Sequence, residues 1–292
     1  MRTYTRSVIA LIPISDANPT KHFPIVTVAL IAINIAVFFL VQPGFGTSNE
    51  ATIYFYENAG VPCQLERECP DIALEAQTPS GEVVGPVELG EEPTLMGFLE
   101  RLLYSTFFHG GFLHLGGNML FLWVFGNNIE DFLGRAKYVA FYLVGGIAAG
   151  LAHVLWTLRL EAMSESAVEA CLRGPAEGCG AIGQYVPAIG ASGAVAAVMG
   201  AYLILFPRHK VNVLVPIVII WTVIKMSAFI VLGLWFVYQF LIGGPDIAGV
   251  GGNSGVAWMA HVGGFVFGAI GIFLLGGRPH HPHHGLVRPG WG

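Results

Sequence analysis

Apolar residues are grouped along this chain into long blocks separated by short polar stretches. A helix needs about 20 apolar residues to cross a bilayer core of about 30 Å. Six blocks approach that length, over residues 24–42, 112–129, 138–158, 188–206, 226–242 and 255–276. The pattern therefore predicts an all-α membrane protein with six transmembrane helices.

One apolar stretch, residues 211–242, is too long for a single ordinary crossing. At about 1.5 Å per residue a helix of that length would extend about 48 Å. Lys225 interrupts the stretch, and a lysine at the centre of a span costs roughly 2.5–3.5 kcal/mol. We therefore expect Lys225 at an interface, a fifth span from Met226 to Ile242, and a surface-lying or re-entrant segment from Val211 to Ile224.

Composition agrees with a membrane location. Charged residues make up 11% of the chain and hydrophobic residues 54%, whereas an average soluble chain is about 25% charged. A fully hydrated surface cannot be built from so few charges. The first span is not expected to be a cleaved signal peptide, because its apolar region is too long and no small-residue cleavage pattern follows it.

Basic residues predict the orientation. With the N-terminus inside, nine lysines and arginines lie in the inner segments and four in the outer loops, so the positive-inside rule places both termini in the cytosol. We expect a multi-pass protein of the cell (cytoplasmic) membrane. Its parts are a cytosolic segment 1–23, a membrane domain 24–276 that includes an acidic outer loop 43–111, and a tail 277–292.

All four cysteines fall in outer loops under this topology. Cys63 and Cys69 lie in the first outer loop, and Cys171 and Cys179 follow the third span. An even number in an oxidising compartment predicts disulfides, with free thiols as the alternative. The proximity of the residues within each loop favours Cys63–Cys69 and Cys171–Cys179. The tail contains several histidines, which fits either metal binding or a disordered tail with titratable charge.

Three polar residues lie at nearly one depth in three parallel spans. Counted from the charged inner ends of their spans, Asn118, Ser192 and His261 are about 20, 24 and 26 Å high. Polar residues inside a membrane are expensive and usually functional. The alternative is a structural hydrogen-bond cluster that joins the helices.

The surroundings of Ser192 favour chemistry. Gly190 and Gly193 flank it at a helix start, where free N–H groups and the helix dipole can stabilise an oxyanion. Small residues continue from Gly193 along this helix, and Gly264 and Gly268 form a GxxxG on the sixth span, so close helix contact would bring Ser192 to His261. No acid is placed to complete a triad, which predicts a Ser–His dyad with His261 as base and then acid.

His114 and Asn118 are four residues apart and share one face of the second span. Both side chains can donate a hydrogen bond to an oxyanion. Zinc binding through His114 is the competing interpretation. It lacks the second histidine and the glutamate of an HExxH motif.

The chain resembles the rhomboid family of intramembrane serine proteases, in its bacterial type, over nearly its whole length except most of the first outer loop. The resemblance rests on motifs around Asp16-Ala17-Asn18-Pro19-Thr20, Arg101 to Gly134, Gly190 to Gly193, Phe206-Pro207-Arg208, Leu232 to Trp235, and Ala260, His261, Gly264 and Gly268. It implies a six-helix bundle whose active site opens to the extracytoplasmic side.

By this resemblance Ser192 is the nucleophile, His261 the general base, and Asn118, His114 and the Ser192 N–H the oxyanion hole. The substrates would be transmembrane proteins in the lipid bilayer, cleaved without a cofactor and without nucleic acid. Two positions depart from the family pattern. Glu100-Arg101 replaces the Trp-Arg of many relatives, and Ala196 stands where some carry an aromatic that stacks on the histidine, so another ring or none would support His261.

Two other functions compete with the intramembrane endopeptidase. A non-catalytic relative would bind membrane proteins without cutting them, but such proteins usually lose the serine or the histidine, and both are present here. A transporter would show repeat symmetry and broken helices at the midplane. No convincing internal repeat is seen, although the 211–224 segment keeps that possibility open.

Overall fold

The computed structural model describes residues 12–46, 48–65, 76–77, 83–84, 93–160, 186–217, 220–247 and 257–279. Its main helices are α1 (Ile25–Leu40), α4 (Phe112–Leu133), α5 (Arg135–Leu160), α7 (Ser192–Leu205), α8 (Ala228–Ile247) and α9 (Trp258–Leu274). Each lies within or largely overlaps one of the six predicted spans. The mostly helical chain therefore fits the predicted all-α membrane fold.

The described part of the chain contains one helical segment, Arg135–Leu158, that is long and apolar enough to cross a membrane. Shorter apolar helices cover Ile25–Leu40, Ser192–Leu205, Ala228–Leu241 and Trp258–Leu274. The positions of the six helices thus agree with the sequence pattern. Six crossings and their orientation stay predictions.

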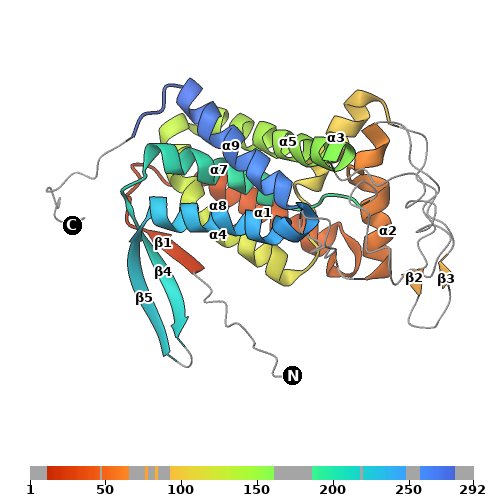
Figure 1. The fold of residues 1–292 in the computed structure, drawn as a ribbon, viewed down its shortest axis with the longest axis horizontal. Coiled ribbons are helices and arrows are strands. Elements are labelled where there is room, and N and C mark those ends of the chain that lie inside the picture. The colour runs from red at the N-terminus through yellow and green to blue at the C-terminus, as the bar shows by residue number, and fades with distance from the viewer. Residues whose placement is uncertain are drawn as a thin grey trace, which may run out of the picture.

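Helix α7 is the centre of the bundle (Figure 1). It contacts α4, α5, α8 and α9, and nearly every residue from Gly193 to Tyr202 is buried. A helix that is hydrophobic on all sides has to be enclosed by other helices. This enclosure places Ser192, the first residue of α7, at one end of a fully packed element.

Two short helices and two 3-10 turns precede α4, in the region predicted as an acidic outer loop. These are η1 (Pro43–Gly46), α2 (Asn49–Asn58), η2 (Pro62–Leu65) and α3 (Leu95–Ser105), and a minimal antiparallel pair joins β2 (Ala76–Gln77) to β3 (Val83–Val84). Ser48 caps α2 and Thr94 caps α3, each by accepting a backbone N–H from the first turn. Parts of this loop therefore form ordered cover over one end of the bundle (Figure 1).

The segment expected to be surface-lying or re-entrant is instead a β-hairpin. Strands β4 (Lys210–Ile217) and β5 (Ile220–Ser227) pair antiparallel, and β1 (Ile12–Asp16) pairs with β4 to give the order β1-β4-β5. Val211 and Val213 are buried, whereas Trp221 and Lys225 are exposed. The run is rich in Val, Ile and Thr, which favour strands, and periodicity alone does not separate a short apolar strand from a helix.

Candidate active site

Ser192 and His261 lie in direct contact. The Ser192 Oγ is 2.7 Å from the His261 Nε2. Ser192 begins α7 and His261 lies in the first turn of α9, so two residues that are far apart in the sequence meet at the same end of the bundle. The contact expected from the two glycine-containing motifs is present.

Small residues on the two helices allow this contact. A Cβ added to Gly264 would collide with the carbonyl oxygen of Gly193, and one added to Gly268 would collide with that of Ala197. Backbones approach this closely only where the residues at the crossing are small. Glycine at these positions therefore sets the distance between α7 and α9, and with it the Ser192–His261 distance.

The turn before Ser192 requires glycine at position 190. Gly190 has φ +123°, a region that other residues rarely adopt, and a Cβ there would lie 2.6 Å from the His114 Nε2. The Gly190 N–H donates to the Ser105 carbonyl at 2.8 Å, which fixes the turn to the end of α3. As a result the His114 ring lies directly against the approach to Ser192.

His114 and Asn118 carry donors suited to an oxyanion hole. The Gly110 N–H donates to the His114 Nδ1 at 3.3 Å, so the proton of a neutral ring is on Nε2, the atom nearest Gly190. Asn118 is 7% exposed, and its Nδ2 has no hydrogen-bond partner among the described residues. A buried amide donor without a partner is costly in a resting protein, which is expected of a group reserved for a ligand.

Gln42 holds the backbone just before α4, and the sequence pattern gives no sign of this role. Its amide donates to the His109 carbonyl at 2.6 Å and accepts the His109 N–H at 3.0 Å. The His109 ring lies 5.2 Å from the His114 ring. Burial, with the neighbouring His114, lowers the pKa of His109 to about 3. The His109 ring is therefore neutral where it packs against His114.

Helix α8 supplies two further residues to which the sequence pattern assigns no role. The Trp235 ring lies 5.8 Å from the His261 ring, tilted by 40°. Ala196 leaves open whether another ring or none supports His261, and Trp235 is a ring close enough for that role. Gln239, one turn later, places its Oε1 2.7 Å from the His261 Nδ1. The only sequence signal for Gln239 was an amide in an otherwise apolar helix.

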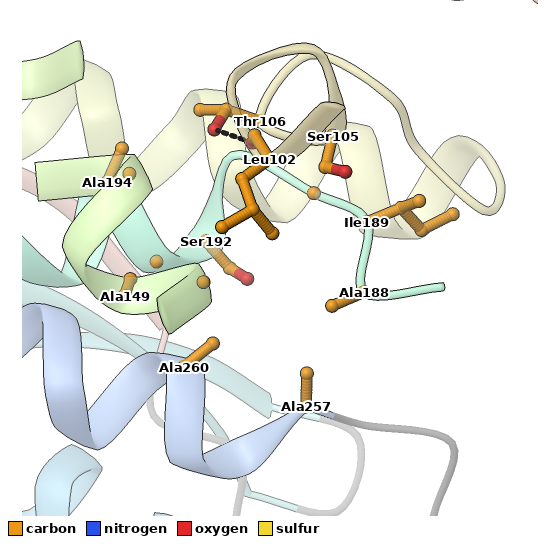
Figure 2. A pocket seen from close by; sticks show the side chains of 14 residues that line it. Leu102, Ser105, Thr106, Ala149, Ala188, Ile189, Ser192, Ala194, Ala257 and Ala260 are labelled. Atoms are coloured by element: carbon orange, nitrogen blue, oxygen red, sulfur yellow. Dashed lines mark hydrogen bonds between the residues drawn. The ribbon is translucent and has the colours of Figure 1, made fainter. Parts of the chain in front are cut away.

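A small pocket adjoins the serine hydroxyl. Figure 2 shows the Ser192 side chain pointing into a space bordered by Leu102, Ala188 and Ala257. Most of the other lining residues are glycine or alanine, namely Gly146, Ala149, Gly150, Gly190, Gly193, Ala194 and Ala260. The larger apolar side chains of the lining are those of Leu102 and Ile189, and Ser105 and Thr106 add hydroxyl groups, so most of the wall next to the serine is small and apolar.

The remaining predicted site residues are only partly described. Cys63 is buried and disulfide-bonded, while Cys69, Cys171 and Cys179 lie outside the described residues. The pairing therefore stays a prediction that non-reducing peptide mapping would test. The histidines of the tail, His280 to His284, also lie outside. Within the described ranges, no three His, Cys, Asp or Glu side chains gather as metal ligands around His114.

Comparison with known proteins agrees with this geometry at the level of the family. The helical bundle brings a serine and a histidine into contact at one of its ends. The family model for the rhomboid domain matches residues 97–278, so the chain belongs to the rhomboid family.

Three relatives illustrate the range of similarity. RHOMBOID-like protein 12, mitochondrial, of Arabidopsis thaliana is 28% identical over 60% of this chain and 46% of its own length. Rhomboid protein 1, mitochondrial, of Saccharomyces cerevisiae is 33% identical over 38% and 26%. The presenilin-associated rhomboid-like protein, mitochondrial, of Mus musculus is 27% identical over 39% and 24%. The chain thus spans less than half the length of these relatives.

These names correct one expectation. The basic residues predict the cytoplasmic membrane of a cell with both termini in the cytosol, yet the relatives are named as mitochondrial proteins. That placement is therefore wrong. The positive-inside rule compares the two sides of one membrane and carries no information about which organelle the membrane belongs to. The relatives named here are eukaryotic, so they lend no support to the bacterial subdivision.

Proposed function

We propose that this protein is an intramembrane serine endopeptidase that hydrolyses peptide bonds in or near transmembrane segments of other proteins. The observation that carries the proposal is the 2.7 Å contact between the Ser192 Oγ and the His261 Nε2, at the start of a buried helix and beside a pocket. Members of the rhomboid family act on transmembrane substrates within the membrane, and the residues of this chain fit that chemistry.

In the proposed mechanism, the Ser192 Oγ attacks the carbonyl carbon of the scissile bond and passes its proton to the His261 Nε2. His261 then gives this proton to the nitrogen of the leaving segment, and the C–N bond breaks. The acyl-enzyme ester is hydrolysed by water in the same way, with His261 accepting a proton from the water and returning it to the Ser192 Oγ. No cofactor is required.

The negative charge on the carbonyl oxygen would be stabilised by the Ser192 N–H, the His114 Nε2–H and the Asn118 Nδ2–H. The first lies at the N-terminus of α7, where backbone N–H groups are free and the helix dipole is positive. One such donor typically contributes about 2.7–4 kcal/mol to the transition state. The unpaired amide of Asn118 supports its assignment to this role.

The substrate helix has to unwind to reach Ser192. Carbonyl groups inside a helix are hydrogen-bonded and shielded, and Ser192 lies at one end of α7 rather than at its midpoint. We therefore expect cleavage in the third of the substrate helix nearest the Ser192 end, assisted by Gly or Pro there. The pocket of glycine and alanine favours a small residue such as Ala just before the scissile bond. Mass spectrometry of the products from a scanning series of substrates tests this, since cleavage near the opposite end, or no loss when that Ala becomes Phe, contradicts it.

The names of the relatives point to a mitochondrial membrane as the location.

Labelling by a fluorophosphonate in detergent separates the proposed function from the two alternatives. Wild-type protein is expected to be labelled on Ser192, and Ser192→Ala and His261→Ala proteins are not. A folded wild-type protein that resists labelling under conditions that label a reference serine hydrolase would instead favour a non-catalytic binder or a transporter.

A further inference from the structure

Gln239 is a buried amide in an apolar helix. It is 3% exposed, and its neighbours on α8 include Phe236 and Phe240. Burying an amide without hydrogen bonds costs several kcal/mol in an apolar environment. Gln239 has two partners. Its Oε1 lies 2.7 Å from the His261 Nδ1, and its Nε2 donates to the Trp235 carbonyl at 3.4 Å.

These two contacts leave one orientation for the amide. The Trp235 carbonyl can only accept a hydrogen bond, so the NH₂ group of Gln239 has to face it, since the flipped amide would oppose two oxygens. The amide oxygen then faces the His261 Nδ1. An amide oxygen is an acceptor only. The His261 Nδ1 must therefore carry the proton of the neutral ring, which leaves a lone pair on Nε2 facing the Ser192 hydroxyl.

We propose that Gln239 is a positioning residue that fixes His261 in the tautomer a general base requires. This inference rests on the proposed function. The wrong tautomer would present an N–H to the Ser192 Oγ and could not accept its proton. Trp235, four residues earlier, lies beside the same ring, with the two ring planes tilted by 40°. One turn of α8 thus sets both the orientation and the protonated nitrogen of His261.

A neutral amide in this place has a physical reason. In serine protease triads a carboxylate orients the histidine and stabilises its cation. An ionised carboxylate on a lipid-immersed helix would carry a large desolvation cost. An amide keeps the orienting hydrogen bond without that cost, and it gives up the charge that would stabilise the imidazolium.

The tautomer can be measured without any assumption about activity. In protein labelled with ¹⁵N-histidine, the signals of His261 are identified by their loss in His261→Gln protein. Wild-type His261 is expected to show a protonated Nδ1 and an unprotonated Nε2 at a pH where the ring is neutral. The opposite assignment overturns the proposal, and this measurement needs no variant of Gln239.

Three variants test the consequence. Gln239→Met keeps the length of the side chain and removes the acceptor, Gln239→Glu keeps an acceptor, and Tyr238→Phe changes an exposed residue of the same helix as the matched control. For Gln239→Met we expect kcat and the fluorophosphonate labelling rate to fall together by about 10-fold or more, with an upper bound near the 10⁴-fold loss seen for a wrong histidine tautomer. KM should change little, Gln239→Glu should retain most of the activity, and Tyr238→Phe should match wild type.

The outcomes separate the two proposals. If wild-type protein is labelled and folded Gln239→Met is labelled at the same rate, Gln239 has no positioning role while the proposed function stands. If wild-type protein is not labelled, the proposed function fails, and the ¹⁵N measurement still decides whether Gln239 fixes the tautomer. If Gln239→Met does not fold, Gln239→Glu and the wild-type tautomer decide. A change in KM alone for Gln239→Met would make it a substrate-binding residue and overturn the proposal.

Discussion

The two ends of the bundle handle polar groups in opposite ways. At the end away from Ser192, Glu130 accepts three hydrogen bonds, from the Val26 and Thr27 N–H groups and the Thr27 hydroxyl, at 3.0, 2.8 and 2.8 Å. At the Ser192 end, the Nδ2 of Asn118 and the Nε2 of His109 are buried without partners among the described residues. The Glu130 carboxyl has its hydrogen bonds made, and we call its side of the bundle the satisfied end, whereas the two polar groups near Ser192 stay available.

Asp16 extends the satisfied end. Its Oδ2 accepts from the Asn128 amide at 2.7 Å and from the Tyr202 hydroxyl at 2.8 Å, so β1 is tied to α4 and to the far end of α7. Because hydrogen bonds at this end join three elements, it holds the helices in register. The chemistry can then occupy the other end at the expense of local stability. Substitutions at the two ends should therefore separate activity from folding.

The largest expected effect is on activity alone. Ser192→Ala and His261→Ala should each abolish cleavage of a reporter transmembrane segment, because each removes one member of the dyad. The thermal unfolding midpoint in detergent should stay close to that of wild type. Cleavage at the wild-type rate by Ser192→Ala protein, purified free of contaminating proteases, would contradict the role of Ser192 as the nucleophile.

Asn118→Ala should lower kcat with little change in KM. Loss of one oxyanion donor typically costs 10²–10³ in rate, or about 2.7–4 kcal/mol, and the remaining donors can reduce this. Because the Asn118 Nδ2 has no partner within the described structure, the substitution breaks no hydrogen bond of that group and should leave the unfolding midpoint nearly unchanged. A rise in KM with unchanged kcat would make Asn118 a binding residue instead.

Glu130→Gln should have the opposite effect, lowering stability rather than kcat. Pro24, the residue before α1, offers no side-chain cap, and the Glu130 carboxyl takes that role for the first N–H groups of the helix. An amide in its place would turn an NH₂ group toward one of these donors, which should cost about 1–3 kcal/mol of stability. Unfolding in detergent measures this, with Glu100→Gln, an exposed position, as the control. Loss of kcat at full stability would instead link Glu130 to the chemistry.

Features that depend on local sequence could be predicted, whereas most contacts between distant segments could not. The helices and the Ser192–His261 contact follow from apolar blocks and small-residue spacing, which are local properties of the sequence. The β-hairpin does not, because the apolar run over 211–224 fits a strand and a buried helix equally well. Gln42 and Gln239 act across the fold, on His109 and His261, and a lone amide in an apolar segment does not indicate its partner. For Asp16 the sequence offers only its place in a family-like segment, with no sign of its hydrogen bonds to Asn128 and Tyr202.

The smallest expected effect is a pH dependence at the satisfied end. Burial raises the pKa of Asp16 from 3.8 to about 6, against hydrogen bonds from Tyr202 and Asn128 that lower it. Between these values the folded state holds a proton that the unfolded state releases, so stability falls as the pH rises from about 4 to about 6.

Asp16→Asn removes the titratable carboxyl group, while the amide oxygen of the asparagine can still accept both hydrogen bonds. We expect the unfolding midpoint of the Asn variant to be less dependent on pH across this interval, and to exceed that of wild type near pH 7. The His22 Nδ1 and the Asp131 Oδ1 lie 2.9 Å apart at the same end and are present in both proteins, so the difference between variant and wild type isolates Asp16. If that difference is constant from pH 4 to pH 7, the carboxyl group of Asp16 is not the group that titrates, and the satisfied end of the bundle owes its stability to hydrogen bonds that do not depend on its protonation.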